Sequence, residues 1–343
     1  MHSLFRTSHP LIQAPMAGVQ DWRLAAAVCE AGGLGSVPAG MLNAQGLEEQ
    51  LTQLSAATNK PWNVNFFCHT SPAPNPEGEQ RWVDALQPFY DEFAADTSAI
   101  ANGPSRQPFD EDSAAVLERF RPAVVSFHYG LPDPALLARV KATGARVLSS
   151  ATTVEEAIWL AENGTDGVIA QGLEAGGHRG HFLSDDLSLQ QGTLSLLPQI
   201  ADAISLPVIA AGGIATPAGV RAARALGASA VQVGTAYLLC PEATTKSVHR
   251  QWLQPYRLDH GIFRAPRPWN DEPVDGYAGP SAGSRTGLPV SGQCHRPVAG
   301  GGGSPGQWRL LAIVGRAVCQ CLPGSLGGRG DPVAGRGLGL VFT

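Results

Sequence analysis

The ten residues 171–180, QGLEAGGHRG, combine residue types that a cofactor-dependent active site needs. Two adjacent glycines, Gly176 and Gly177, let a backbone approach a ligand closely. The next residue, His178, carries an imidazole that titrates near neutral pH and can act as a base. The segment fits a flat cofactor lying against main chain with a base beside it. A surface turn with a solvated histidine is the alternative.

Further polar and glycine residues stand at the ends of other short apolar runs. Amides and a histidine end two of these runs, and glycines end two more. These residues are Asn63, Asn65 and His128, with the pairs Gly212-Gly213 and Gly234-Thr235. Their simplest alternative roles are an interior amide bonded to backbone and tight turns. What they can do depends on the elements that carry them.

The apolar runs are short and rich in β-branched residues, and most intervals between them have a helical pattern, as at 153–164 and 216–227. We expect strands at 10–19, 32–40, 61–69, 122–130, 145–152, 166–172, 207–214 and 228–238. Eight strands alternating with helices predict an α/β fold, the (β/α)8 or TIM barrel. In such barrels the carboxyl ends of the strands meet at one mouth. All the candidate residues fall there, and glycines after strands seven and eight occupy the usual phosphate position.

The interval between the third and fourth strands is too long for a plain crossover. Its segment QRWVDALQPFYDEF has a helical pattern, so we expect a helical excursion here, over the barrel mouth.

Composition excludes several classes of function. The net charge is −5 and only 15% of residues are charged, without a basic stripe, so we expect no nucleic-acid partner. The sequence shows no signal peptide and no long apolar run, which predicts a cytoplasmic protein that does not enter a membrane. The six cysteines are dispersed and lack metal-binding spacing, so we expect free thiols and no metal.

Six blocks of the sequence resemble one enzyme family. LIQAPMAGV, NVNFFCH, VSFHYG, AQGLEAGGHRG, PVIAAGGI and ASAVQVGTAYL are similar to the FMN-dependent nitronate monooxygenases, formerly called 2-nitropropane dioxygenases, over residues 9–245. The resemblance implies a domain at 1–250 that binds FMN noncovalently. It also implies oxidation of small alkyl nitronates, such as propionate 3-nitronate, by O2 to a carbonyl compound and nitrite, in a nitroalkane detoxification role.

The resemblance also assigns roles to residues. His178 matches the base that removes the proton beside a nitro group, and it would orient a nitronate that already lacks this proton. His128 either lines the substrate side or is a buried histidine bonded to backbone. Arg179 could attract an anionic substrate, but we expect it to point outward into solvent. The implied FMN-binding residues are Ala14, Pro15, Met16, Asn65, Gln171, Gly176, Gly177, Gly212, Gly213, Gln232, Val233, Gly234 and Thr235. Met16 could instead be core filler.

Two other functions stay open. One is an FMN-dependent NAD(P)H reductase of quinones or enoyl thioesters. The other is an inactive flavin-binding remnant. The sequence specifies no oligomeric state.

The resemblance stops near residue 250, where the composition changes. Residues 251–343 include 19 glycines and 10 prolines and no lysine, which predicts an irregular or disordered tail. Back-translation of YRLDHGIFRAPRPWNDEPVD (256–275), read one nucleotide later, permits TALTTAFSGRPARGMMNRLM, which resembles the family's GRPARG region. We therefore interpret the tail as a frameshift product that replaces the helical C-terminal part of the family.

Overall fold

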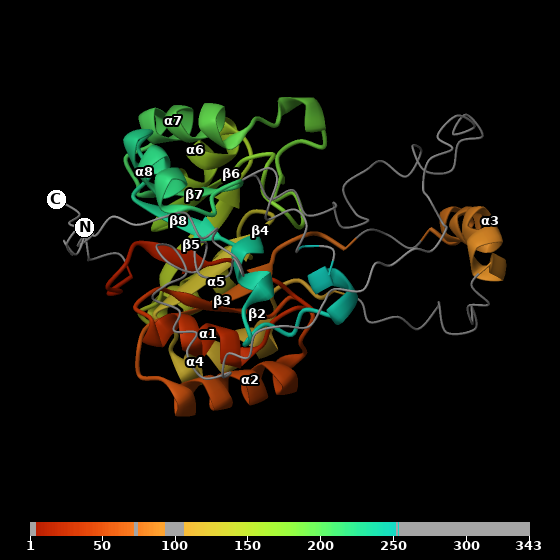
Figure 1. The fold of residues 1–343 in the computed structure, drawn as a ribbon, viewed down its shortest axis with the longest axis horizontal. Coiled ribbons are helices and arrows are strands. Elements are labelled where there is room, and N and C mark those ends of the chain that lie inside the picture. Colours follow the sequence, from red (N-terminus) through yellow and green to blue (C-terminus); the bar gives the residue numbers. More distant parts are fainter. Residues whose placement is uncertain (1–4, 72–74, 93–105, 252, 254–343) are drawn as a thin grey trace, which may run out of the picture.

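A computed structural model gives the fold and describes residues 5–71, 75–92, 106–251 and 253. One sheet of eight parallel strands runs in the order β1-β8-β7-β6-β5-β4-β3-β2 (Figure 1). A single bridge from Ile12 to Leu34 sets β1 beside β2, so the sheet nearly closes into the predicted barrel. The strands are β1 Leu11–Gln13, β2 Gly35–Pro38, β3 Trp62–Phe67, β4 Val124–His128, β5 Arg146–Ala151, β6 Gly167–Gln171, β7 Val208–Ala211 and β8 Ala230–Val233.

Helices connect most successive strands, as the (β/α)8 prediction requires. They are α1 Trp22–Glu30, α2 Ala44–Ala57, α3 Pro76–Glu92, α4 Glu111–Phe120, α5 Pro134–Ala142, α6 Val154–Glu162, α7 Thr193–Ala203 and α8 Pro217–Ala225, with short 3-10 turns η2 Leu187–Leu189 and η3 Thr235–Leu239. Thr153 and Thr216 begin α6 and α8, because each side chain accepts a hydrogen bond from a backbone N–H of the first turn. The two helices expected at 153–164 and 216–227 are thereby confirmed.

The long connection after β3 carries α3, so the predicted helical excursion is confirmed. Its expected position over the barrel mouth is not: no residue of α3 is buried, and Figure 1 draws the helix apart from the barrel. Trp82 and Phe89 are exposed on it. The sequence pattern revealed the helix but not what it packs against.

The inner face of the barrel is apolar at its base and polar at its mouth. Leu34, Val124 and Leu148 belong to one buried cluster inside the sheet. Side chains two residues apart on a strand share a face, so the buried Ser36 and Ser126 lie on that same inner face nearer the carboxyl ends. The strands therefore present polar groups at the mouth, where the candidate site residues lie.

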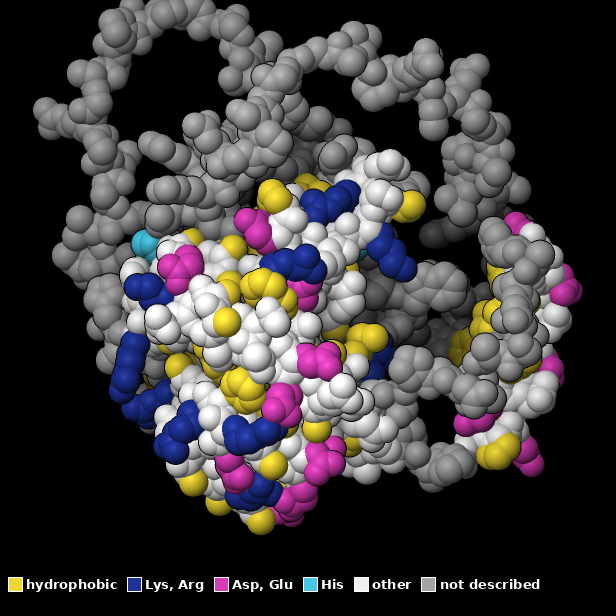
Figure 2. Space-filling model, turned by 90° about the horizontal axis from the view of Figure 1, so that it is seen from below, with side chains coloured by type: hydrophobic (Ala, Val, Ile, Leu, Met, Phe, Trp, Pro, Cys, Tyr) yellow, Lys and Arg dark blue, Asp and Glu magenta, His cyan; other side chains and the backbone are white. Residues whose placement is uncertain are grey.

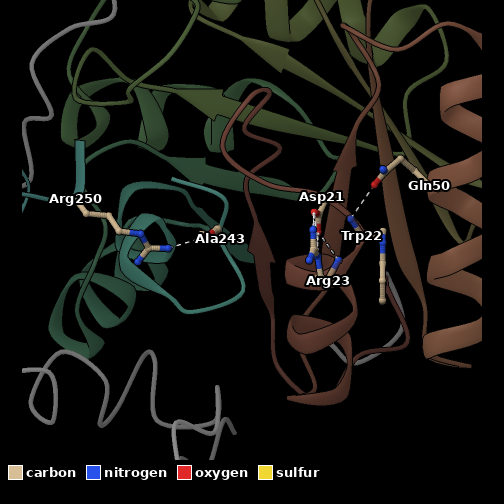
Figure 3. A network of polar contacts seen from close by, with 6 residues as sticks. All are labelled: Asp21, Trp22, Arg23, Gln50, Ala243 and Arg250. Atoms are coloured by element: carbon tan, nitrogen blue, oxygen red, sulfur yellow. Dashed lines mark hydrogen bonds and ion pairs between the residues drawn. The ribbon is translucent and has the colours of Figure 1, made fainter. Parts of the chain in front are cut away.

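Polar contacts outside the barrel fix the connections that surround it (Figure 3). Trp22 N donates to Gln50 Oε1 at 2.9 Å, which ties α1 to α2, and Arg23 pairs with Asp21 at 2.6 Å. Arg250 Nη2 donates to Ala243 O at 2.6 Å and so holds the segment after η3. The boundary predicted at residue 250 stays a prediction. Nearly all of the tail predicted at 251–343 lies outside the described residues.

The face shown in Figure 2 mixes basic and acidic side chains rather than separating them. Within the part of the chain that the structure describes, no helix combines the length and apolar character needed to cross a membrane.

Candidate active site

Two buried amide side chains on β3 hydrogen-bond to serines on the neighbouring strands, inside the barrel. Asn63 Nδ2 donates to Ser36 Oγ at 3.0 Å and to Ser126 Oγ at 2.9 Å. Asn65 Nδ2 donates to Ser126 Oγ at 3.0 Å and to Ser126 O at 3.2 Å. The amide nitrogen of Asn65 therefore bonds to its neighbouring strand, the interior role that the sequence offered as the alternative. Because an amide oxygen is an acceptor only, a contact from Asn65 to a cofactor donor would use Oδ1.

Gln171 holds the loop that carries His178. Its Nε2 donates to His178 O at 2.9 Å, and its Oε1 accepts from Gly180 N at 2.7 Å. Both ends of one buried amide thus bind the same loop on either side of Arg179. Each amide atom retains a second hydrogen-bonding position, so this clamp is compatible with the predicted contact from Gln171 to a flavin ring.

Arg179 does not point into solvent, and that expectation was wrong. Its Nη1 and Nη2 donate to Gly172 O at 3.0 and 3.1 Å, and Nη2 also donates to Ala175 O at 3.0 Å. The loop turns back on itself, which directs these two carbonyls at a common point. A planar guanidinium with several fixed donors fits such a pair of acceptors. Arg179 is therefore a second clamp on the segment before His178.

A third contact joins the loop to the glycines after β7. Glu174 Oε2 accepts hydrogen bonds from Thr193 N at 2.7 Å and from Thr193 Oγ1 at 2.8 Å. Partial burial raises the pKa of the Glu174 carboxyl, but these two hydrogen bonds, together with one from its own backbone N–H and the charge of Arg179, hold the pKa below its ordinary value. Thr193 Oγ1 also lies 3.1 Å from Gly212 O. Gly212 and Gly213 both have positive φ, 125° and 67°, so the chain turns sharply there.

His178 lies at the mouth among rings from β3 and the end of β4. Its ring centroid is 5.5 Å from that of Phe67 and 6.5 Å from that of Tyr129, both in edge-on geometry. Tyr129 has a φ of 68°, a left-handed conformation that is uncommon outside glycine and often marks functional sites. His69, which the sequence did not single out, is 6.0 Å from Tyr129 in the same cluster.

His128 is held by two polar contacts at the end of β4. Its Nδ1 lies 3.0 Å from Ser150 Oγ, and its Nε2 lies 3.1 Å from His178 O. Burial lowers the pKa of this imidazole to about 4. Of the two roles considered from the sequence, the structure shows the histidine bonded to backbone.

The ends of β1 and β8 lie against each other. Ala14 N donates to Val233 O at 2.8 Å, and the Val233 side chain belongs to the buried core. A side-chain carbon placed on Gly234 would lie 3.4 Å from Ala14 Cβ and 3.5 Å from Met16 Sδ. The partly buried Met16 also packs on that core. The structure thus brings most of the segment 14–16 to the end of β8.

Gly176 and Gly177 on the histidine loop have open space beside them. A side-chain carbon on Gly176 would meet only Thr235 Oγ1, at 3.9 Å, and one on Gly177 would meet nothing within 4 Å. Gln232 Oε1 is buried and has no hydrogen-bond partner among the described residues, although buried polar atoms are nearly always paired. Open space beside two glycines and an unsatisfied buried acceptor on β8 are features that suit a polar cofactor. In the described ranges no group of three or more His, Cys, Asp or Glu side chains could hold a metal ion.

Glu156 is a structural residue of the site that sequence reasoning missed. Its buried carboxylate accepts hydrogen bonds from Thr152 N at 2.7 Å and from Thr152 Oγ1 at 2.8 Å. The other oxygen accepts from Phe182 N at 2.6 Å and Leu183 N at 3.3 Å. The carboxylate therefore ties the end of β5 to the segment that follows Gly180. An acidic residue in the first turn of a helix is common, so no sequence pattern indicates this second role.

Comparison with known proteins shows relatives along most of the chain. A family model described as nitronate monooxygenase matches residues 1–266. The nitronate monooxygenase of Paraburkholderia phytofirmans is 44% identical over 245 residues, covering 71% of this chain and 67% of that protein. The Pseudomonas aeruginosa nitronate monooxygenase is 44% identical over 253 residues, covering 73% and 72%.

Solved structures of related enzymes superpose on most of the chain. A nitroalkane oxidase from Streptomyces ansochromogenes superposes with a TM-score of 0.66 at 39% identity, covering 72% of this chain and 71% of that one. FabK from Thermotoga maritima superposes with a TM-score of 0.55 at 30% identity, covering 74% and 66%.

Proposed function

Since the chain belongs to the nitronate monooxygenase family of flavin-dependent oxidoreductases, we propose that it binds FMN at the barrel mouth and oxidises alkyl nitronates with O2. The products are a carbonyl compound and nitrite. The observation that carries the proposal is the loop 171–180, whose side chains Gln171, Glu174 and Arg179 all hold the segment around His178. Such clamping fits a catalytic group that must keep its position.

The residues at the mouth suit the parts of FMN. Gly176 and Gly177 leave room for the ring system, and the amides of Asn65 and Gln171 can bond its polar edge. The chain around Gly213 and from 232 to 235 would hold the ribityl chain and phosphate on main-chain N–H groups. The main chain of 14–16 would lie close to the ring system. When bound, the flavin supplies the electron transfer, and the protein contributes binding and orientation.

His178 is the group that contacts the substrate. With a nitroalkane, its neutral imidazole takes the proton from the carbon beside the nitro group. With a nitronate that proton is already absent, and the same ring donates a hydrogen bond to the anion. The rings of Phe67 and Tyr129 pack edge-on beside it.

These two roles separate in one experiment. O2 consumption and nitrite release are measured with propionate 3-nitronate and with nitroethane, for the parent and for His178→Asn. We expect the parent to oxidise the nitronate. Loss of the base should reduce nitroethane turnover by about 100-fold or more and nitronate turnover by less. A parent protein that binds flavin but releases no nitrite from either compound contradicts the proposal.

The likeness to FabK is the observation that favours a second candidate, an FMN-dependent NAD(P)H reductase of quinones or enoyl thioesters. Its TM-score and identity are lower than those of the nitroalkane oxidase. Oxidation of NADH by a quinone in the same preparation tests it. A chain that binds flavin and catalyses neither reaction is the inactive remnant.

A further inference from the structure

We propose that His128 is a positioning residue for His178. Its neutral ring carries the hydrogen on Nε2, and this N–H donates a hydrogen bond to the His178 carbonyl. The proposal rests on the proposed function only in taking His178 as the catalytic group. His128 then acts through the main chain of that residue rather than on the substrate.

The hydrogen-bond partners fix the tautomer. His178 O, 3.1 Å from His128 Nε2, is a carbonyl oxygen and can only accept, so Nε2 must carry the hydrogen. In a neutral imidazole the other nitrogen is then an acceptor. Ser150 Oγ, 3.0 Å from Nδ1, is a hydroxyl that can donate to it. The chain of donors therefore runs from Ser150 on β5 through His128 on β4 to His178.

The surroundings of His128 favour the neutral ring. Burial is the main cause of its low pKa of about 4. The hydrogen bond to the His178 carbonyl raises the pKa, and the charges of His178, Arg179 and His181 on the loop after β6 lower it. From its own strand, the Tyr129 ring packs 4.6 Å away, centroid to centroid. A group in this setting keeps one tautomer across the working pH range.

The ring is also fixed by packing against the loop that it serves. A side-chain carbon on Gly180 would lie 2.7 Å from His128 Cε1 and 3.0 Å from Nδ1. Only glycine at that position lets the ring approach this backbone. The His178 carbonyl thus receives two donors, His128 Nε2 from β4 and Gln171 Nε2 from β6, and it is held between two strands.

Nitrogen NMR of the histidine side chains tests the tautomer directly. The full chain with FMN is labelled with ¹⁵N, and the His128 signals are assigned by their loss in His128→Gln. We expect the neutral Nε2–H pattern, constant from about pH 5.5 to 8.5. A proton on Nδ1, or a titration within this range, overturns the proposal. The readout needs no turnover, so its failure is distinct from failure of the proposed function.

Two isosteric variants test the direction of the contact. The amide nitrogen of His128→Gln can reach the place of Nε2, whereas that of His128→Asn lies near Nδ1 and can reach only Ser150. We expect kcat to fall about tenfold more in the Asn variant than in the Gln variant, the equivalent of one net hydrogen bond, with KM changed less than kcat. Melting temperatures of both variants report the fold. Equal losses of kcat in the two variants overturn the proposal.

Discussion

Replacement of Arg179 by methionine should loosen the histidine loop without unfolding the barrel. The guanidinium donates to Gly172 O and Ala175 O at 3.0–3.1 Å. A hydrogen bond from a charged donor contributes about 1.5–3 kcal/mol. Because the site is at the mouth, hydrogen bonds from water replace part of this contribution when the guanidinium is removed. We therefore expect the folded conformation of the loop to lose about 2 kcal/mol of stability, which corresponds to a decrease of roughly 30-fold in kcat/KM.

The assay combines kinetics with hydrogen exchange. Turnover of propionate 3-nitronate gives kcat/KM, exchange of the 171–180 amides reports the loop, and thermal unfolding reports the barrel. In Arg179→Met, exchange should accelerate in that loop while the melting temperature changes little, because the loop contributes little of the core.

Arg179→Lys is the matched control. Lysine keeps the positive charge but has no planar fork to join two carbonyls, so it should behave like Arg179→Met. If Arg179→Lys retains most of the activity, attraction of an anionic substrate by charge explains the residue better than the clamp. Unchanged loop exchange in Arg179→Met would refute the clamp outright.

Four more outcomes are expected. Glu156→Ala should lower the free energy of unfolding by about 3 kcal/mol in urea titrations, because buried donors lose a charged acceptor; a change below about 1 kcal/mol contradicts this. The thiols of Cys29 and Cys68 should resist iodoacetamide at pH 8 in the folded protein, since burial raises the pKa of Cys29 to about 11 and raises that of Cys68 as well; rapid modification, located by peptide mass spectrometry, would be inconsistent with that burial. The pKa of Glu174 is lowered in the fold, so the stability that its carboxylate contributes is complete above the ordinary glutamate pKa and is lost as pH falls through the lower folded value. The difference in unfolding free energy between the parent and Glu174→Gln should therefore shrink in acid, and a difference that does not depend on pH argues against this role of the carboxylate. Resequencing across codons 245–280 should reveal the one-nucleotide shift, whereas a confirmed frame shared by near relatives rejects the frameshift hypothesis.

The barrel could be predicted because its strands are continuous apolar runs between amphipathic helices. Each strand of the structure lies within its predicted range, for example β6 Gly167–Gln171 within 166–172. The position of α3 could not be predicted in this way, because a helical pattern reports a face to be buried but not the surface that buries it. The structure buries none of its residues.

The sequence indicated several residues that lie together at the barrel mouth, but not the hydrogen bonds between them. The resemblance marked His178, Gln171 and His128, but the hydrogen bonds among them depend on how the loop after β6 folds back on Gln171 and against the end of β4. The side chain of Arg179 was wrongly expected to point into solvent for the same reason: the two carbonyls that it binds converge only once the loop has folded. Sequence patterns carry no record of such acceptors.

The visible spectrum of the purified chain tests the central claim most directly, before and after anaerobic addition of propionate 3-nitronate. The account predicts an oxidised flavin spectrum that changes when the nitronate is added, in parent protein that then releases nitrite once O2 is admitted. A flavin spectrum that responds to NADH but not to the nitronate, or a colourless protein, would contradict it.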